Sequence, residues 1–123
     1  MRKVKFLLVY PNLMLVNTLP NNIGILAAVI KNAGHNVRLF DTTLYHTSDL
    51  SNDEMRVKRM QIRKFDIHSY GVSLKDENVY HDFVRCVTEY QPDIIGVSLV
   101  QDTLTLGLYL IESIPSEMRS IPI

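Results

Sequence analysis

This sequence has one cysteine, no excess of positive or negative charge and no long apolar run. The single cysteine, Cys86, can neither form a disulfide within the chain nor build a zinc or iron–sulfur site by itself. Thirteen Lys and Arg balance thirteen Asp and Glu, so no long-range field draws the chain to nucleic acid or to an anionic membrane. The apolar runs are far too short to cross a bilayer. We therefore expect a protein of the reducing cytoplasm without nucleic-acid or membrane partners.

What is present is the composition of one ordinary globular domain. The chain has 123 residues, of which 46% are hydrophobic and 21% charged. This balance excludes disordered, collagen-like and coiled-coil chains. A length within the usual range for a single domain predicts one domain over residues 1–123.

Hydrophobic patterning predicts strands that alternate with helices. The expected strands are 4–10, 36–41 and 93–100. The expected helices are 21–33, 51–60, 76–90 and 102–114, with Gly34 as the left-handed stop of the first and an insertion loop over 61–75. Strand–helix–strand units of this kind are nearly always right-handed and parallel. The prediction is a Rossmann-like, three-layer α/β domain with a parallel sheet.

The last residues suggest that this sheet is incomplete. Residues 120–123 have the pattern of the first residues of a fourth strand, and doubly wound sheets commonly contain five or six strands. We expect a domain truncated at its C-terminus, which would be the N-terminal part of a longer protein.

Three polar segments are predicted to meet where such sheets bind ligands, beyond the carboxyl ends of the strands. They are residues 10–12, 41–43 and 98–103. None contains a catalytic triad, and neither the G-x-G-x-x-G fingerprint nor the phosphate-binding G-x-x-x-x-G-K-[ST] loop is present. Pro11, Asn12 and Ser98 occupy the places where a phosphoacceptor receiver domain has acidic residues.

Segments 6–12, 19–37 and 92–98, read as FLLVYPN, LPNNIGILAAVIKNAGHNV and PDIIGVS, carry a resemblance that spans most of the chain. In order and spacing they resemble the N-terminal cobalamin-binding domain of B12-dependent radical SAM enzymes. The resemblance implies that the domain holds cobalamin against a following radical SAM barrel. That barrel would use S-adenosylmethionine and a [4Fe–4S] cluster for methyl transfer or a related radical reaction. With Cys86 alone, this chain cannot supply the C-x-x-x-C-x-x-C cluster motif, so we expect no catalysis from it.

The resemblance also implies which residues contact the cofactor. Pro11 and Asn12 would lie beside the corrin, and the segment after the third strand would shape the pocket for its nucleotide tail. Gly24 costs a helix about 1 kcal/mol relative to Ala, which either close ligand approach or close packing on the sheet would explain. The ten expected positions are Pro11, Asn12, Ile23, Gly24, Asp41, Thr42, Ser98, Leu99, Gln101 and Thr103.

Residues 66–71 match D-x-H-x-x-G, the motif that supplies an axial histidine to cobalt in cobalamin proteins of the methionine synthase type. Neutral imidazole is a good ligand, and an aspartate can orient its second nitrogen. In that type, however, the motif follows the first strand, and here residues 10–12 occupy that place. His68 is a candidate cobalt ligand, and a loop histidine is the favoured alternative.

Two other functions remain open at this point. One is a flavodoxin-like regulatory or interaction domain without catalysis, which the missing receiver acids disfavour. The other is a domain that binds a flavin or a nucleotide in the same place, which the missing glycine loops disfavour. A corrin, a flavin and the absence of a chromophore give three different visible spectra.

Overall fold

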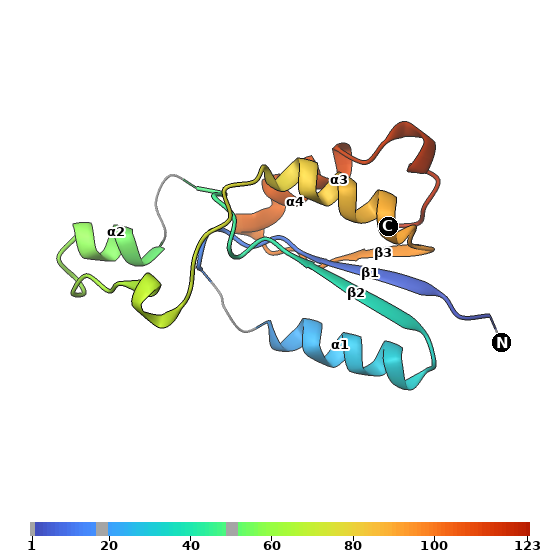
Figure 1. Ribbon diagram of the computed structural model, residues 1–123, viewed down its shortest axis with the longest axis horizontal. Helices are drawn as coiled ribbons and strands as arrows, with labels where there is room; N and C mark the ends of the chain where they lie inside the picture. The colour runs from blue at the N-terminus through green and yellow to red at the C-terminus, as the bar shows by residue number, and fades with distance from the viewer. Residues whose placement is uncertain (1, 17–19, 49–51) are drawn as a thin grey trace.

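A three-stranded parallel sheet between two helical layers forms the protein in the computed structural model, which describes residues 2–16, 20–48 and 52–123 (Figure 1). The central strand is β1 (Lys5–Tyr10). It pairs in parallel with β2 (Asn36–Asp41) on one side and with β3 (Ile94–Val97) on the other, in the order β2-β1-β3. The predicted α/β fold with a parallel sheet is confirmed.

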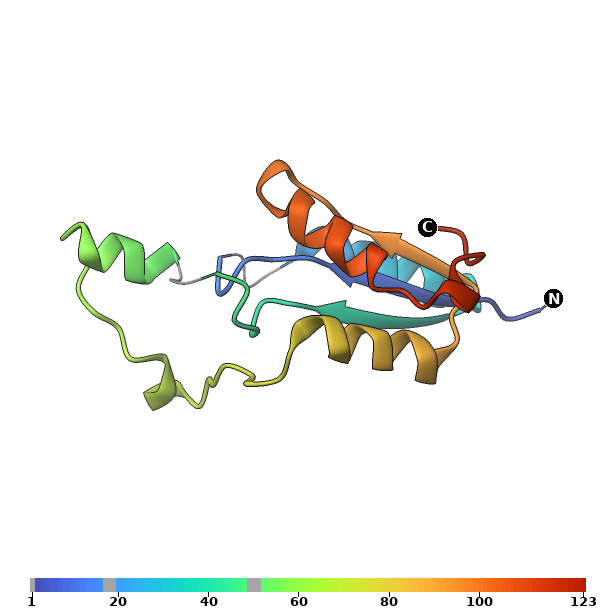
Figure 2. The same cartoon turned by 90° about the horizontal axis from the view of Figure 1, so that it is seen from above.

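Apolar side chains on both faces of β1 explain the three layers. Leu8 and Tyr10 pack with Ile23 of α1 (Asn21–Asn32) on one face. On the other face lie α3 (Val79–Tyr90) and α4 (Leu104–Glu112) (Figures 1 and 2). The larger part of the core lies on this second face and includes Leu7, Val9, Phe40, Phe83, Val87, Ile95, Leu106 and Leu110.

Most element boundaries follow the sequence prediction, and the differences have local causes. Gly34 has a φ of 86°, as a left-handed helix stop requires. Helix α3 begins at Val79 rather than at 76, because the side chain of Asn78 caps it by accepting hydrogen bonds from the backbone N–H groups of Tyr80 and His81. β3 ends at Val97, three residues early, because the chain enters the 3-10 helix η2 (Gln101–Thr103) immediately before α4.

The C-terminal residues correct another expectation. After the 3-10 helix η3 (Ser116–Met118), residues 120–123 form no strand. The carbonyl of Pro122 accepts a hydrogen bond of 2.9 Å from the N–H of Ile95. Since Ser98, three residues along, directs its N–H to Val9 of β1, the Ile95 N–H points to the opposite edge of β3. Residues 120–123 thus meet the outer edge of β3 through the hydrogen bond of Pro122, and Ile121 packs against the core.

Residues 46–48 and 52–74 form an arm that extends beyond the carboxyl ends of the strands (Figures 1 and 2). The arm contains α2 (Asn52–Lys58) and the 3-10 helix η1 (Ile67–Tyr70), which lies where a loop was expected. The predicted cap of α2 at Ser51 lies outside the described residues. At the base of the arm, the N–H of Lys75 donates to the carbonyl of Leu44 over 2.8 Å. Within the described part of the arm, no side chain belongs to the buried core.

Each helix within the described residues is too short or too polar to cross a membrane.

Candidate functional site

A cavity of about 480 Å³, called the crevice below, opens at the carboxyl ends of β1 and β3. The connection after β1 runs to α1 on one face of the sheet, and the chain after β3 runs to α4 on the other. The crevice therefore lies at the switch point of the sheet, where open α/β domains bind ligands. Its lining consists of Tyr10, Pro11, Asn12, Leu13, Val16, Asn22, Ser48, Met55, Ser98, Val100, Asp102 and Thr103.

Four of the ten predicted cofactor contacts line the crevice, namely Pro11, Asn12, Ser98 and Thr103. The hydroxyl oxygen of Ser98 accepts a hydrogen bond of 2.9 Å from the side-chain amide of Asn22. This bond joins the first turn of α1 to the end of β3 across the crevice. Because Ser98 Oγ acts there as an acceptor, its own proton remains to be donated to a ligand.

Asp41 and Thr42, also predicted contacts, hold two loops together instead of lining the crevice. The N–H of Asn12 donates to Thr42 Oγ1 and Thr42 Oγ1 donates to the Asn12 carbonyl, both over 2.7 Å. The side-chain amide of Asn12 donates to Thr43 Oγ1 over 2.9 Å, and Thr43 Oγ1 donates to Asp41 Oδ1 over 2.6 Å. Thr42 is 0% exposed. These bonds fix the loop after β1 to the loop after β2, and so fix one wall of the crevice.

Ile23 and Gly24 do not reach the crevice either. Ile23 is 3% exposed and packs on the sheet. A Cβ added at Gly24 would meet no atom within 4 Å, so close packing on the sheet does not explain this glycine. Gly24 instead lines a separate groove between α1 and β2.

Leu99 and Gln101 are exposed and stand outside the lining of the crevice. A Cβ added at Gly107 of α4 would collide with the Leu99 side chain. Leu99 is therefore packed against α4, and Gly107 provides the space for it. No local sequence pattern predicts this contact, because Leu99 and Gly107 lie on different elements and only the fold brings them together.

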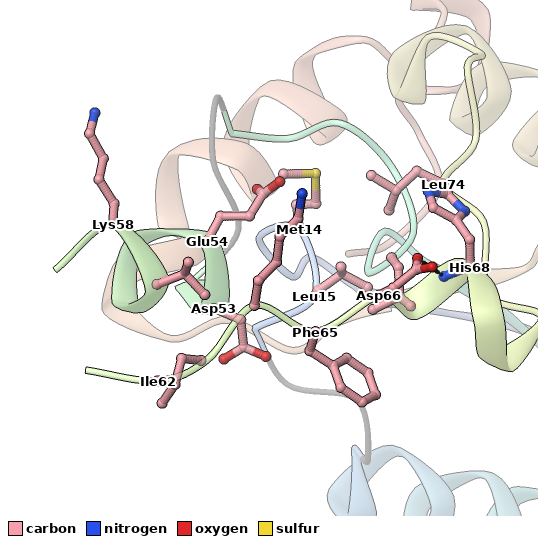
Figure 3. A pocket seen from close by; sticks show the side chains of 13 residues that line it. Met14, Leu15, Asp53, Glu54, Lys58, Ile62, Phe65, Asp66, His68 and Leu74 are labelled. Carbon is pink, nitrogen blue, oxygen red and sulfur yellow. Dashed lines mark hydrogen bonds between the residues drawn. The ribbon is translucent and has the colours of Figure 1, made fainter. Parts of the chain in front are cut away.

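A second cavity of about 770 Å³, the arm cavity, lies between the arm and the loop after β1 (Figure 3). Apolar side chains such as Met14 and Phe65 line it, and charged side chains such as Asp53 and Lys58 stand among them. Sequence reasoning missed this cavity, since its walls come from segments without apolar periodicity. The full lining is Met14, Leu15, Asp53, Glu54, Val57, Lys58, Ile62, Lys64, Phe65, Asp66, Ile67, His68 and Leu74.

His68 lies in the arm cavity, and its motif has a structural use. The carboxylate of Asp66 caps η1 by accepting a hydrogen bond of 3.0 Å from the backbone N–H of His68. Gly71 ends η1 with a φ of 75°. The Asp and the Gly of D-x-H-x-x-G are thus the two caps of one short helix. Across the described residues, no three His, Cys, Asp or Glu side chains are grouped as a metal site.

The short segment of residues 13–16 forms part of the wall between the two cavities. Leu13 and Val16 line the crevice, whereas Met14 and Leu15 line the arm cavity. Leu15 has a φ of 58°, a left-handed conformation that costs a non-glycine residue about 1–2 kcal/mol. A hydrogen bond of 3.0 Å from its N–H to the carbonyl of Thr43 holds it there.

Buried charge fixes the base of the arm. The hydroxyl of Tyr45 donates to the buried carboxylate of Asp82 over 2.8 Å, and Arg85 forms an ion pair with the same carboxylate. The ammonium of Lys75 lies 4.8 Å from the centroid of the Tyr45 ring. Burial raises the pKa of Tyr45 above its ordinary value, and the hydrogen bond to Asp82 raises it further.

The chain matches no family model, no curated protein and no solved structure in the comparisons made with it. The resemblance carried by segments 6–12, 19–37 and 92–98 therefore stays a prediction, and the function has to be argued from the crevice itself.

Proposed function

We propose that this domain binds cobalamin at the carboxyl edge of its sheet. The observation that carries the proposal is the crevice at the switch point, which gathers Pro11, Ser98 and Thr103 from the loops after β1 and β3. A cavity of about 480 Å³ is within the range of small-ligand sites, and it holds only part of so large a cofactor. The nucleotide tail would occupy the crevice, and the corrin would lie outside it.

The residues of the crevice suit such a tail chemically. Ser98 and Asn22 present hydroxyl and amide groups that bond phosphate, ribose and amide oxygens. Leu13 and Val100 provide apolar surface for a planar base. Asp102 also lines the crevice, and its carboxylate would repel a phosphate, so the phosphate belongs on the side of Ser98 and Asn22.

The role of the chain would be to bind and position the cofactor. Bound cobalamin supplies a cobalt centre that carries and transfers alkyl groups. In the proposed parent enzyme, a radical SAM barrel would hold S-adenosylmethionine and the [4Fe–4S] cluster, and the protein would work in the reducing cytoplasm, which suits its single cysteine. His68 is left out of the proposed site, because it lines the arm cavity and its neighbour Asp66 bonds to the backbone.

Equilibrium dialysis with hydroxocobalamin, read by visible absorbance, tests the proposal. We expect the wild-type chain to bind the corrin and the Ser98→Phe variant to bind it at least about ten-fold more weakly, because a phenyl ring fills the crevice. The matched control is Ser120→Phe at an exposed position outside the crevice, and it should bind as the wild type does. A thermal melt of each variant shows that it is folded.

Two outcomes would contradict the proposal. If the wild-type chain binds no corrin, cobalamin is not its ligand, and a flavin-like spectrum of the purified chain would favour the flavin alternative. If Ser98→Phe and Ser120→Phe bind equally well, the cofactor does not use the crevice.

A further inference from the structure

The outer edge of β2 is an open strand edge. Asn36 and Thr42 direct their N–H groups toward the β1 side, to the carbonyls of Val4 and Tyr10. Because the backbone alternates along a strand, Val37, Leu39 and Asp41 direct theirs outward. No strand in the described part of the chain pairs with this edge. β2 runs for six residues in continuous register, without the proline or bulge that commonly protects an edge.

A groove of about 940 Å³ accompanies this edge between β2 and α1. Leu39 is 44% exposed on the strand, and Ile25 is 66% exposed on the helix. Gly24 and Ala28, one turn apart on α1, also line the groove, and their small side chains leave this flank of the helix low. The edge therefore presents backbone hydrogen-bonding groups and apolar surface side by side.

We infer that a second copy of this chain covers the edge, with the two β2 strands antiparallel about a two-fold axis at Leu39. In this register Leu39 pairs with Leu39 of the other copy, and Val37 pairs with Asp41. Every one of these residues has outward backbone groups, so each pair is a hydrogen-bonded pair of an antiparallel ladder. The two sheets join into one, and the contact is self-complementary, as a two-fold interface requires.

Helix packing favours a second copy as the occupant. α1 lies on the same face of the sheet as Val37 and Leu39, since all three line one groove. The two-fold axis therefore brings the two α1 helices together on one face of the joined sheet. Gly24 and Ala28 allow their backbones to approach closely, which gives the open space around Gly24 a use.

Charge also favours a second copy. Lys31 lies in the groove near Val37, at one end of β2. Asp41 stands at the other end of β2 and pairs with Tyr10 of β1. Because Tyr10 packs with Ile23 of α1, Asp41 lies on the same face of the sheet as α1. Antiparallel pairing places Asp41 of each copy across from Lys31 of the other, so that opposite charges face each other twice while Asp41 Oδ1 keeps its bonds to Thr43. With thirteen acidic and thirteen basic residues, two copies have no net charge to repel each other.

Sedimentation velocity over a range of concentrations tests the dimer. We expect the wild-type chain to form a dimer and Leu39→Lys to shift the dissociation constant by at least about 100-fold, because two ammonium groups then meet on the axis. The control is Leu108→Lys on α4, at a side chain of similar exposure away from the groove, and it should dimerise as the wild type does. A wild-type chain that stays monomeric at high concentration overturns the inference.

A cysteine at the axis tests the register. Hydrogen-bonded antiparallel pairs have Cα atoms about 5.5 Å apart, within the span of a disulfide. In a Cys86→Ser background, Leu39→Cys should form a covalent dimer on mild oxidation, whereas Leu108→Cys should not. A dimer that resists Leu39→Lys and shows no selective cross-link at residue 39 would place the interface elsewhere. Neither readout involves cobalamin, so the inference stands or falls independently of the proposed function.

Discussion

Buried polar side chains that bond to one another determine the geometry of the site residue by residue. Asn12, Thr42 and Thr43 form hydrogen bonds that join the loops after β1 and β2. Tyr45 and Asp82 do the same for the base of the arm. A buried polar group that loses its partner costs about 1–3 kcal/mol, so these bonds hold the loops in one arrangement before any ligand arrives.

Tyr45→Phe should weaken the fold at neutral pH and change how stability depends on pH. The variant loses a hydrogen bond to a buried carboxylate, which costs about 2 kcal/mol. The pKa of Tyr45 in the folded chain is raised above its ordinary value of 10.0, so the folded chain keeps the phenol proton when the unfolded chain has lost it. Stability from this group is complete below pH 10 and is lost as the pH rises above it.

Urea unfolding between pH 7 and about pH 11.5 measures this difference. Above pH 10 the wild-type chain should lose up to about 1.4 kcal/mol per pH unit more than Tyr45→Phe. The raised pKa values of Tyr90 and Cys86 affect both proteins equally. Parallel pH profiles for the two proteins would show that Tyr45 does not carry the linkage.

Among the elements, α1 has one glycine within it and one just after it, and the two have opposite roles. Gly34 follows the helix with a φ of 86°, which L side chains rarely adopt. Gly24 lies in the first turns, and an added Cβ would meet open space. Gly34 is required by the backbone, whereas within a single chain Gly24 lowers the helical propensity of α1 and meets no steric demand.

Substitution of each glycine by alanine should therefore shift stability in opposite directions. Gly34→Ala should destabilise the chain by about 1 kcal/mol, because alanine is strained in the left-handed region. Gly24→Ala should stabilise it by about 0.5–1 kcal/mol through helical propensity. Chemical unfolding of both variants at low protein concentration gives the comparison. A loss of stability in Gly24→Ala would mean that its surroundings are closed.

The sequence predicts those elements whose signals are local. β2 occupies the predicted residues 36–41 because Gly34, just before it, is turn-forming and the interior of the strand is β-forming. Val79, Phe83 and Val87 were expected to share one face of α3, and all three are buried. Their spacing alone determines that face.

The parts of the site that the sequence does not predict are assembled by tertiary contacts. The sheet topology alone predicts that the loops after β1 and β3 meet, and in the structure Pro11 and Ser98 of these loops line the same crevice. The inward use of Asp41 depends instead on bonds to Thr43 and on to Asn12, about thirty residues away. Polarity marks a residue as a candidate but does not tell whether a ligand or another loop will bond to it.

For the molecule as a whole, the arm is separable from the packed layers. Among its described residues none is buried in the core, and its base is closed by bonds at Leu44, Tyr45 and Lys75. The three strands and their covering helices contain the burial that drives folding.

Replacing residues 46–74 by a Gly/Ser linker of about six residues should leave the fold intact. We expect a cooperative melt within about 5 °C of the wild type, because none of the described side chains of the arm belongs to the buried core. In the intact chain, brief trypsin treatment should cut first in the arm, after the exposed Lys58, Arg59, Arg63 or Lys64. Loss of cooperative unfolding in the shortened chain would show that the arm is part of the folding unit.

The segment of residues 13–16 has a thermodynamic consequence for the two cavities that it separates. A displacement of this segment that widens the crevice would narrow the arm cavity, since Leu13 and Val16 face the crevice and Met14 and Leu15 face the arm cavity. Occupants of the two cavities would therefore be linked, and each would change the other's dissociation constant by the same factor. Because Leu15 holds the segment in a strained conformation, relief of that strain is a free-energy source available to either occupant. A molecule in the arm cavity would thus change the affinity of the crevice for the proposed ligand without entering the crevice.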